Sequence, residues 1–135
     1  MLFYKRPYLM SKNKFLVVKK YINKYLNKGF IYFSISLVAT SILLAKKLRG
    51  GIWFCINYRG LNTIVIKNWY PVLLIYKTFK RLSQAKIYTK LNIITAFNHL
   101  QIREGDKWKT VFILHFSQFK YTVIPFGVYN GPDTF

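Results

Sequence analysis

Two adjacent glycines between two apolar runs constrain the fold of this chain more than any other feature. Gly50 and Gly51 follow the run at residues 42–47 and precede the run at residues 52–58. Paired glycines reach the backbone angles of tight β-turns, and apolar runs on both sides are typical of strands. The sequence therefore predicts a β-hairpin with its turn at these glycines.

A helix is predicted before this hairpin. Across residues 8–28 apolar side chains recur at spacings of three and four, the repeat of one helix face. Ser11 can cap such a helix at its N-terminus, and Gly29 is suited to end it. We therefore expect an N-terminal helix that ends at about residue 28.

Further elements are predicted after the hairpin. Pro71 is favoured in the first turn of a helix, so a second helix is expected at residues 72–82. Residues 86–93 alternate as a strand does, and residues 108–114 and 119–124 are expected to pair as strands. The sequence therefore predicts both helices and strands after the hairpin.

The charge balance of the chain is extreme. Lysine and arginine together number 22, against the acidic residues Glu104, Asp106 and Asp133, for a formal net charge of +19. Such an excess attracts polyanions, so nonspecific electrostatic binding of nucleic acid is the expected interaction. Any carboxylate-based catalytic or metal site must use those three residues. The single cysteine, Cys55, excludes an internal disulfide and a cysteine-rich zinc site.

One uncharged segment leaves a membrane alternative open. Residues 29–45 carry no charge and are flanked by Lys28 and Lys46. Their length just reaches the lower limit of about 17 residues for a spanning helix. A small membrane-associated basic protein is therefore an alternative, although a membrane is not the expected partner. No signal peptide is apparent, which favours an intracellular protein whose compartment is unknown.

Four motifs follow one another along the chain: FCINYRGLN at 54–62, KNWYP at 67–71, YTKLNI at 88–93, and IPFG with NGP at 124–132. They resemble the patterns RFCVDYRxLN, KNRYP, TKLDL and MPFGLxNAPATF in the reverse transcriptase domain of gypsy-type LTR retrotransposon Pol polyproteins. The resemblance covers essentially the whole chain, only faintly over residues 8–45. It implies an α+β fold made of partial polymerase fingers and palm, with an N-terminal helix at 8–28, fingers at 29–85 and the first part of the palm at 86–135.

The resemblance also implies a nucleotide-binding surface. Lys46 and Lys47 match the fingers lysines that reach the triphosphate of the nucleotide in this family. Phe97 matches the aromatic residue that blocks a ribose 2′-hydroxyl, and Phe126 and Gly127 match the turn along the nucleotide and template. For the two lysines a solvated hairpin tip is an equal alternative, and Phe97 can instead be a core residue.

Near the template the family pattern is altered. Arg59 matches an arginine that lies close to the template, with a structural salt bridge as the rival role. Asn57 replaces the neighbouring Asp of the family. Trp53 stands where the family has an arginine that holds the triphosphate. An indole cannot make the bidentate, charge-assisted bonds of a guanidinium, so weaker binding of nucleotide is expected.

The catalytic position is altered as well. Asn92 stands where the family has a metal-binding Asp, and the later Asp-Asp strand of the family has no counterpart among these residues. The intact family binds two Mg²⁺ ions, which several carboxylates must hold, and a neutral amide is a weak ligand for them. We therefore expect no metal site, no cofactor and no RNA-directed DNA polymerase activity in this chain.

A degenerate, truncated fragment is the resulting interpretation, and the rest of a polyprotein is then its covalent partner. Several departures from the family pattern, such as Asn92 and Trp53, are those that C-to-T changes in the DNA produce. This direction of change is typical of a decaying element copy. A nonspecific nucleic-acid-binding remnant is the alternative, because the positive charge alone provides that affinity.

Overall fold

The protein has a mixed α+β architecture, as predicted. The computed structural model describes residues 9–48, 50–69 and 74–134. Its elements are, in chain order, α1 (Lys12–Asn27), β1 (Ile31–Phe33), β2 (Thr40–Lys46), β3 (Ile52–Ile56), α2 (Arg59–Asn62), α3 (Ile75–Leu82), the 3-10 helices η1 (Ala96–His99) and η2 (Glu104–Thr110), β4 (Phe112–Ile113), β5 (Gln118–Tyr121) and α4 (Gly131–Thr134).

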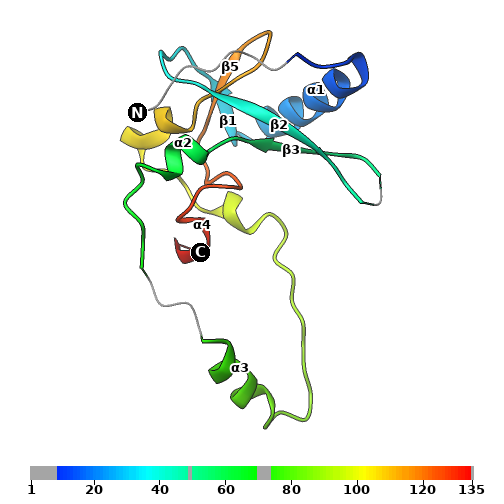
Figure 1. The fold of residues 1–135 in the computed structure, drawn as a ribbon, viewed down its shortest axis with the longest axis vertical. Coiled ribbons are helices and arrows are strands. Elements are labelled where there is room, and N and C mark those ends of the chain that lie inside the picture. The colour runs from blue at the N-terminus through cyan, green and yellow to red at the C-terminus, as the bar shows by residue number, and fades with distance from the viewer. Residues whose placement is uncertain (1–8, 49, 70–73, 135) are drawn as a thin grey trace.

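The strands form one five-stranded sheet in the order β1-β5-β4-β2-β3. All neighbouring strands are antiparallel except β2 and β4, which are parallel. In this parallel pair, Thr40 is the partner of Phe112 and Ser41 is the partner of Ile113. The long β2–β3 hairpin extends beyond the other strands and ends in its turn (Figure 1). The sheet therefore joins segments that lie far apart in the sequence and leaves the tip of this hairpin projecting.

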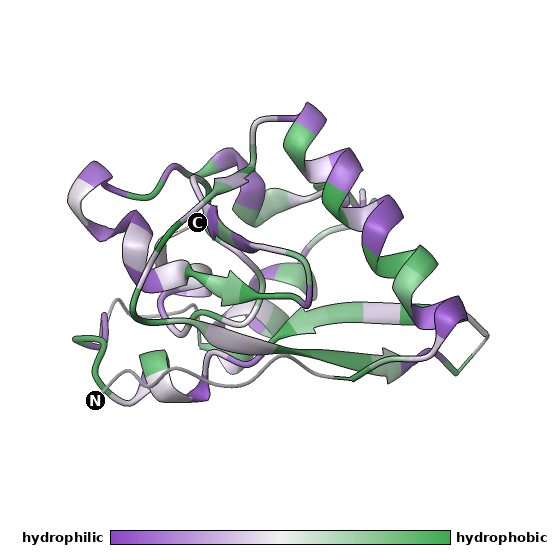
Figure 2. Ribbon diagram, turned by 90° about the horizontal axis from the view of Figure 1, so that it is seen from above, coloured by the Kyte–Doolittle hydropathy of each residue, from purple (hydrophilic) through white to green (hydrophobic). Residues whose placement is uncertain are grey.

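The predicted hairpin is confirmed, and its side chains alternate between two faces. Ile42 pairs with Ile56, and both side chains are buried in the core. Ala45 pairs with Trp53 on the opposite face, where the indole is 51% exposed. Figure 2 shows both strands coloured as hydrophobic over most of their length, although only one face meets the core. The other face of β3 is consequently apolar and open to solvent.

The core lies between α1 and the sheet. Val18 and Ile22 of α1 are buried against a cluster that includes Phe112, Phe119 and Tyr121 of β4 and β5. Full burial of each aliphatic side chain contributes about 1.5–3 kcal/mol relative to exposure. The opposite side of α1 is hydrophilic (Figure 2). The apolar spacing that predicted this helix is thus the face that packs on the sheet.

Both ends of α1 agree with the predicted signals. Ser11 occupies the N-cap position in an extended conformation, but its side chain makes no cap hydrogen bond. Gly29 follows the C-cap residue Lys28 with a φ of 68°, a conformation that residues with a side chain rarely adopt. Residue 8, where the predicted helical segment begins, lies outside the described residues.

The chain between the hairpin and η1 forms an arm, here defined as residues 74–94. Figure 1 shows α3 lying away from the sheet, with an extended stretch leading from it towards η1. None of the α3 residues is buried. Large apolar side chains on the arm are exposed, including Phe79 at 66% and Leu91 at 85%. The predicted start of this helix at Pro71 lies outside the described residues, and α3 itself agrees with the prediction.

The prediction of a strand at residues 86–93 was wrong. The described structure has no strand there, and all eight residues are exposed on the arm. An alternating pattern becomes a strand only when a neighbouring strand satisfies its backbone N–H and C=O groups. Within the described ranges no strand lies beside these residues, so the pattern alone produced no ladder.

The prediction of a strand from residue 108 was also wrong in part. Residues 108–110 complete η2, and only Phe112–Ile113 form β4. Two ion pairs, Glu104–Lys107 and Asp106–Lys109, join residues three positions apart in η2. In a 3-10 helix such residues lie directly above one another, so the charge spacing favours this helix over a strand.

The uncharged segment at residues 29–45 forms β1, a connecting loop and most of β2 rather than a helix. Hydroxyl side chains of this segment form hydrogen bonds with main-chain groups of the loop and of the chain after β3. The Ser36 hydroxyl accepts a hydrogen bond from the main-chain N–H of Val38, and the Thr40 hydroxyl donates one to the carbonyl of Asn57. In the described ranges no helix combines the length and apolar content needed to cross a bilayer.

Candidate nucleic-acid interface

The tip of the β2–β3 hairpin presents two adjacent lysines. Lys46 ends β2, and the main-chain N–H of Lys47 donates to the carbonyl of Gly51 at 3.1 Å. Gly50 and Gly51 have φ values of 84° and 91°, which fits the turn predicted from the sequence. Both lysine side chains are exposed. The hairpin therefore holds two cations at its end.

Behind this tip the two faces of β3 differ in character. Phe54 points into the core, where its ring stacks on Tyr21 with centroids 4.2 Å apart. Trp53 points to the opposite face, and the Nζ of Lys47 lies 5.8 Å from its ring centroid. A cation at this distance from an indole is attracted by the ring quadrupole. The replacement of a family arginine by Trp53 thus leaves an aromatic ring beside a lysine.

A turn at residues 124–131 approaches this face of the hairpin. Gly127 has a φ of 99°, and a Cβ there would meet the carbonyl oxygen of Ile56 and the Tyr58 ring at 3.9 Å. The Asn62 side chain donates to the carbonyl of Gly127 at 2.8 Å and accepts from the N–H of Tyr129 at 2.9 Å. The turn is therefore fastened to α2 and packs closely on the end of β3.

This turn brings together aromatic residues from three separate segments. Phe126 is 66% exposed, and its ring centroid lies 6.4 Å from that of Trp53 and 6.4 Å from that of Phe97 in η1. These spacings are within the normal range for interacting aromatic pairs. We refer to Trp53, Phe126 and Phe97 as the aromatic row. Lys47 lies at one end of the row, beside the exposed Trp53 and Phe126, and the half-buried Phe97 lies at the other end.

A pocket of about 330 Å³ adjoins the aromatic row. Phe97 and Phe126 line it together with residues from α1, β5 and the chain before η1, among them Ile93. Phe97 is half-buried and lies beside Gly131, where an added Cβ would be 3.6 Å from its ring. Phe97 therefore lines the pocket and also packs against the start of α4, which leaves both sequence interpretations of this residue standing.

Arg59 and Asn92 are not part of the aromatic row. Arg59 is the first residue of α2 and is exposed, whereas Leu61 two residues later is buried. Asn92 lies in the exposed stretch of the arm, next to the pocket-lining Ile93. Of the predicted site residues, Lys47, Phe97, Phe126 and Gly127 thus lie at or beside the aromatic row. Lys46 shares the hairpin tip, but strand alternation places its side chain on the face opposite Trp53.

The carboxylates of the chain do not fit a site for Mg²⁺ at Asn92. Glu104 and Asp106 are ion-paired in η2, where hydrogen bonds from Lys107 and Lys109 lower the pKa of the respective carboxyl. Asp133 belongs to α4. Across the described ranges no three His, Cys, Asp or Glu side chains are grouped to hold a metal ion.

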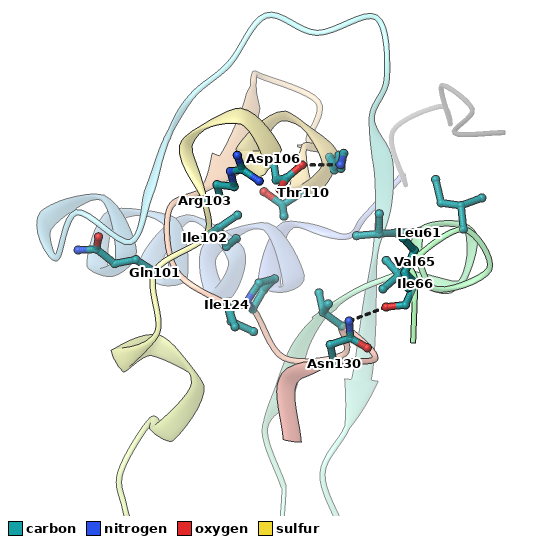
Figure 3. Close-up of a pocket in the computed structure, with 14 residues that line it drawn as sticks. Leu61, Val65, Ile66, Gln101, Ile102, Arg103, Asp106, Thr110, Ile124 and Asn130 are labelled. Carbon is teal, nitrogen blue, oxygen red and sulfur yellow. Dashed lines mark hydrogen bonds and ion pairs between the residues drawn. The ribbon is translucent and has the colours of Figure 1, made fainter. Parts of the chain in front are cut away.

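A larger pocket lies on the other side of the 124–131 turn. It measures about 480 Å³, and Figure 3 shows Ile102 and Ile124 facing Leu61 and Val65 across it. Asp106 and Asn130 lie at opposite ends (Figure 3). The Asn130 side chain donates to the carbonyl of Ile66 at 2.9 Å and so ties the chain after α2 to the turn. None of the sequence-predicted site residues lines this pocket.

Sequence reasoning missed two contributors to the site. Trp53 was interpreted only as a lost arginine, although its position on β3, opposite the core-facing residues, signals exposure. Asn62 belongs to the RGLN part of a recognised motif, but nothing in the sequence indicates that its side chain reaches the turn 65 residues later. That contact depends on the tertiary fold.

The fold is shared with solved reverse transcriptases. A structure of the foamy viral protease-reverse transcriptase in complex with double-stranded DNA superposes with a TM-score of 0.75, at 21% identity over 97% of this chain and 22% of that chain. The same viral protein in complex with an RNA/DNA hybrid gives a TM-score of 0.76, at 19% identity over 95% of this chain and 17% of that chain. These likenesses define a reverse transcriptase-like fold.

Sequence comparison indicates the kind of element. The Tf2-3 and Tf2-4 transposon polyproteins of Schizosaccharomyces pombe are each 29% identical to it over 130 residues, 96% of this chain. No family model matches the sequence. The chain spans about 10% of the length of these polyproteins. Fold and sequence together support a retroelement reverse transcriptase-like domain.

Proposed function

We propose that this chain supplies the fingers and the first part of the palm of a gypsy-type retrotransposon reverse transcriptase, and that it binds nucleic acid without catalysing nucleotide addition. The proposed division places residues 29–85 in the fingers and residues 86–135 in the palm. Similarity to transposon polyproteins and the reverse transcriptase-like fold support it. Within this proposal, Lys46 and Lys47 contact phosphates, Phe126 and Gly127 lie along the nucleic acid, and the exposed Arg59 faces the template.

The position of Asn92 carries the proposed loss of catalysis. In the family pattern this position supplies a carboxylate to two metal ions about 4 Å apart. Asn92 is an exposed amide, and the carboxylates of Glu104 and Asp106 are ion-paired with lysines of η2. Two divalent cations separated by about 4 Å repel each other strongly, so several anionic ligands are needed to hold them. An amide contributes no charge to offset that repulsion.

Primer extension on an RNA template with Mg²⁺ tests this proposal. The purified 135-residue chain and its Asn92→Asp variant should both fail to add nucleotides, because a single restored carboxylate cannot hold two metal ions. An active reverse transcriptase in the same assay is the positive control. Template-dependent incorporation by the unsubstituted chain would refute the proposed inactivity.

Nonspecific binding of nucleic acid is the second candidate function, and the charge of the chain favours it. The formal net charge of +19 accompanies exposed lysines at the hairpin tip and along α1. Such binding releases counterions, so the logarithm of the association constant should fall linearly with the logarithm of the salt concentration. Filter binding across a salt series measures this slope, and a flat response would exclude electrostatic contact as the source of affinity.

A further inference from the structure

We propose that the aromatic row is a stacking platform for the unpaired bases of a single-stranded nucleic acid, with Lys47 contacting an adjacent phosphate. This inference rests on the proposed nucleic-acid binding and specifies its mode. It depends on Trp53, which stands where the family pattern has an arginine that holds phosphate.

The exposure of the rings is the first observation. The Trp53 indole is 51% exposed and the Phe126 ring 66% exposed, yet they contact one another at a centroid distance of 6.4 Å. Large aromatic side chains gain most from burial, and adjoining exposed apolar rings commonly mark a surface that another molecule covers. The Gly127 turn lies close to β3, and the two rings meet edge to face with their planes at 84°.

The charge around the rings identifies the occupant as an anion-bearing chain. The Nζ of Lys47 lies 5.8 Å from the Trp53 ring centroid, on the same face of the hairpin. The neighbouring Lys46 ends β2 and projects from the opposite face. Glu104 and Asp106 are held away in their own ion pairs with lysines of η2. A strand of nucleic acid can contact the lysine and the rings together, because each nucleotide carries an anionic phosphate and a flat base.

The rings favour single strands over duplexes. Inside a duplex the faces of the bases are already stacked on their neighbours, and only edges and phosphates are accessible. In a single strand each base has a free π-face, and stacking on an aromatic side chain tolerates any sequence. A guanidinium at residue 53 would hold phosphate, whereas an indole presents a surface that fits a base.

The chain contains a matched control for Trp53. Trp108 is 47% exposed, and the Nζ of Lys109 lies 5.8 Å from its ring centroid, values close to those of Trp53 and Lys47. Among the described residues, however, no second exposed ring packs against Trp108. A comparison of Trp53→Ala with Trp108→Ala therefore separates the aromatic row from any exposed tryptophan beside a lysine.

Fluorescence anisotropy with three labelled probes tests the inference. The probes are an oligothymidylate of about 12 nucleotides, an abasic oligomer with the same number of phosphates, and a duplex of equal length. Trp53→Ala should weaken oligothymidylate binding about tenfold, the loss expected for one stacked base. Binding of the abasic oligomer and the duplex should not change, Trp108→Ala should bind every probe normally, and Trp53→Phe should retain most of the affinity.

Each alternative result has a defined meaning. Equal losses for Trp53→Ala and Trp108→Ala, or equal affinity of the unsubstituted protein for abasic oligomer and oligothymidylate, would overturn the stacking platform while leaving electrostatic binding intact. If the unsubstituted protein binds none of the probes, both this inference and the proposed nucleic-acid binding fail. Circular dichroism of each variant confirms that the half-exposed tryptophans can be replaced without loss of the fold.

Discussion

The side-chain amide of Asn62 donates a hydrogen bond to the main-chain carbonyl of Gly127, 65 positions later in the chain, at 2.8 Å. The carbonyl oxygen of the same amide accepts a hydrogen bond from the N–H of Tyr129 at 2.9 Å. One side chain thus satisfies a main-chain acceptor and a main-chain donor of the turn that carries Phe126. The position of the aromatic row depends on this contact between α2 and the turn.

Asn62→Ala should destabilise the protein and loosen this turn. The substitution removes two solvent-accessible hydrogen bonds, each worth about 0.5–1.5 kcal/mol, so the free energy of unfolding should fall by about 1–2 kcal/mol. Urea denaturation measures the change. Asn23→Ala, an exposed position on α1, is the control and should change stability by less than about 0.5 kcal/mol. Equal stability of the two variants would contradict the bridging role of Asn62.

Gly127→Ala should destabilise the protein through backbone strain rather than steric overlap. An added Cβ meets its nearest atoms at 3.9 Å, an ordinary contact distance, but the φ of 99° is unfavourable for alanine. The expected loss in unfolding free energy is about 1–3 kcal/mol. Gly60→Ala is the matched control, because it lies in α2 with no atom within 4 Å of its Cβ position. That variant should be neutral or slightly stabilising.

Phe112→Ala should be among the most destabilising single substitutions in the chain. The Phe112 ring is fully buried and lies within 6 Å of the rings of Phe54, Phe119 and Tyr121. Its removal leaves a cavity in the core, with an expected cost of about 3–5 kcal/mol. Phe79→Ala, on the exposed face of α3, should cost less than about 0.5 kcal/mol. Thermal unfolding of both variants compares the two environments, and similar melting temperatures would contradict this core.

Stability should decrease at alkaline pH because of buried tyrosines. Burial raises the pKa of Tyr58, Tyr21 and Tyr121 above the ordinary value of 10.0. The unfolded chain releases these phenol protons near that pH, whereas the folded chain keeps them, so the unfolded state binds fewer protons above it. The free energy of unfolding is therefore unaffected by these groups below about pH 10 and falls as the pH rises further.

Urea denaturation at about pH 8 and about pH 11 measures this decrease. Tyr121→Phe removes one buried phenol, together with its 2.9 Å hydrogen bond to Tyr21, and should reduce the difference between the two pH values. Tyr76→Phe, at an exposed site on α3, should leave the difference unchanged. Constant stability across this pH range would contradict the burial of the tyrosine cluster.

Replacement of both Lys46 and Lys47 by glutamine should weaken nucleic-acid binding for every probe, including the abasic oligomer. Each phosphate that the variant no longer neutralises should reduce the magnitude of the salt slope by about 0.7 for a single strand. The same double change at Lys19 and Lys20, exposed on α1, removes equal charge from another element. If both double variants show the same decrease in affinity, the hairpin tip is not a preferred binding surface.

Sequence periodicity anticipated the elements that are stabilised by their own local signals. The apolar face of α1, the paired glycines of the β2–β3 turn and the glycine after α1 all act within a few residues, so their consequences could be read from neighbouring positions. The two failed predictions, a strand at 86–93 and a strand from residue 108, concern patterns whose outcome depends on partners. One pattern had no neighbouring strand, and the first residues of the other belong to a 3-10 helix whose ion pairs join residues three positions apart.

The candidate site divides in the same way. The motifs predicted a nucleotide-binding role for Lys46, Lys47, Phe97, Phe126 and Gly127 and an altered metal position at Asn92, and these roles stay predictions. The contact of Trp53 with Phe126 and the link from Asn62 to the turn required the tertiary structure. Local backbone preferences and residue chemistry are properties of the sequence itself, whereas contacts between distant segments exist only after the core has brought β3, α2 and the turn together.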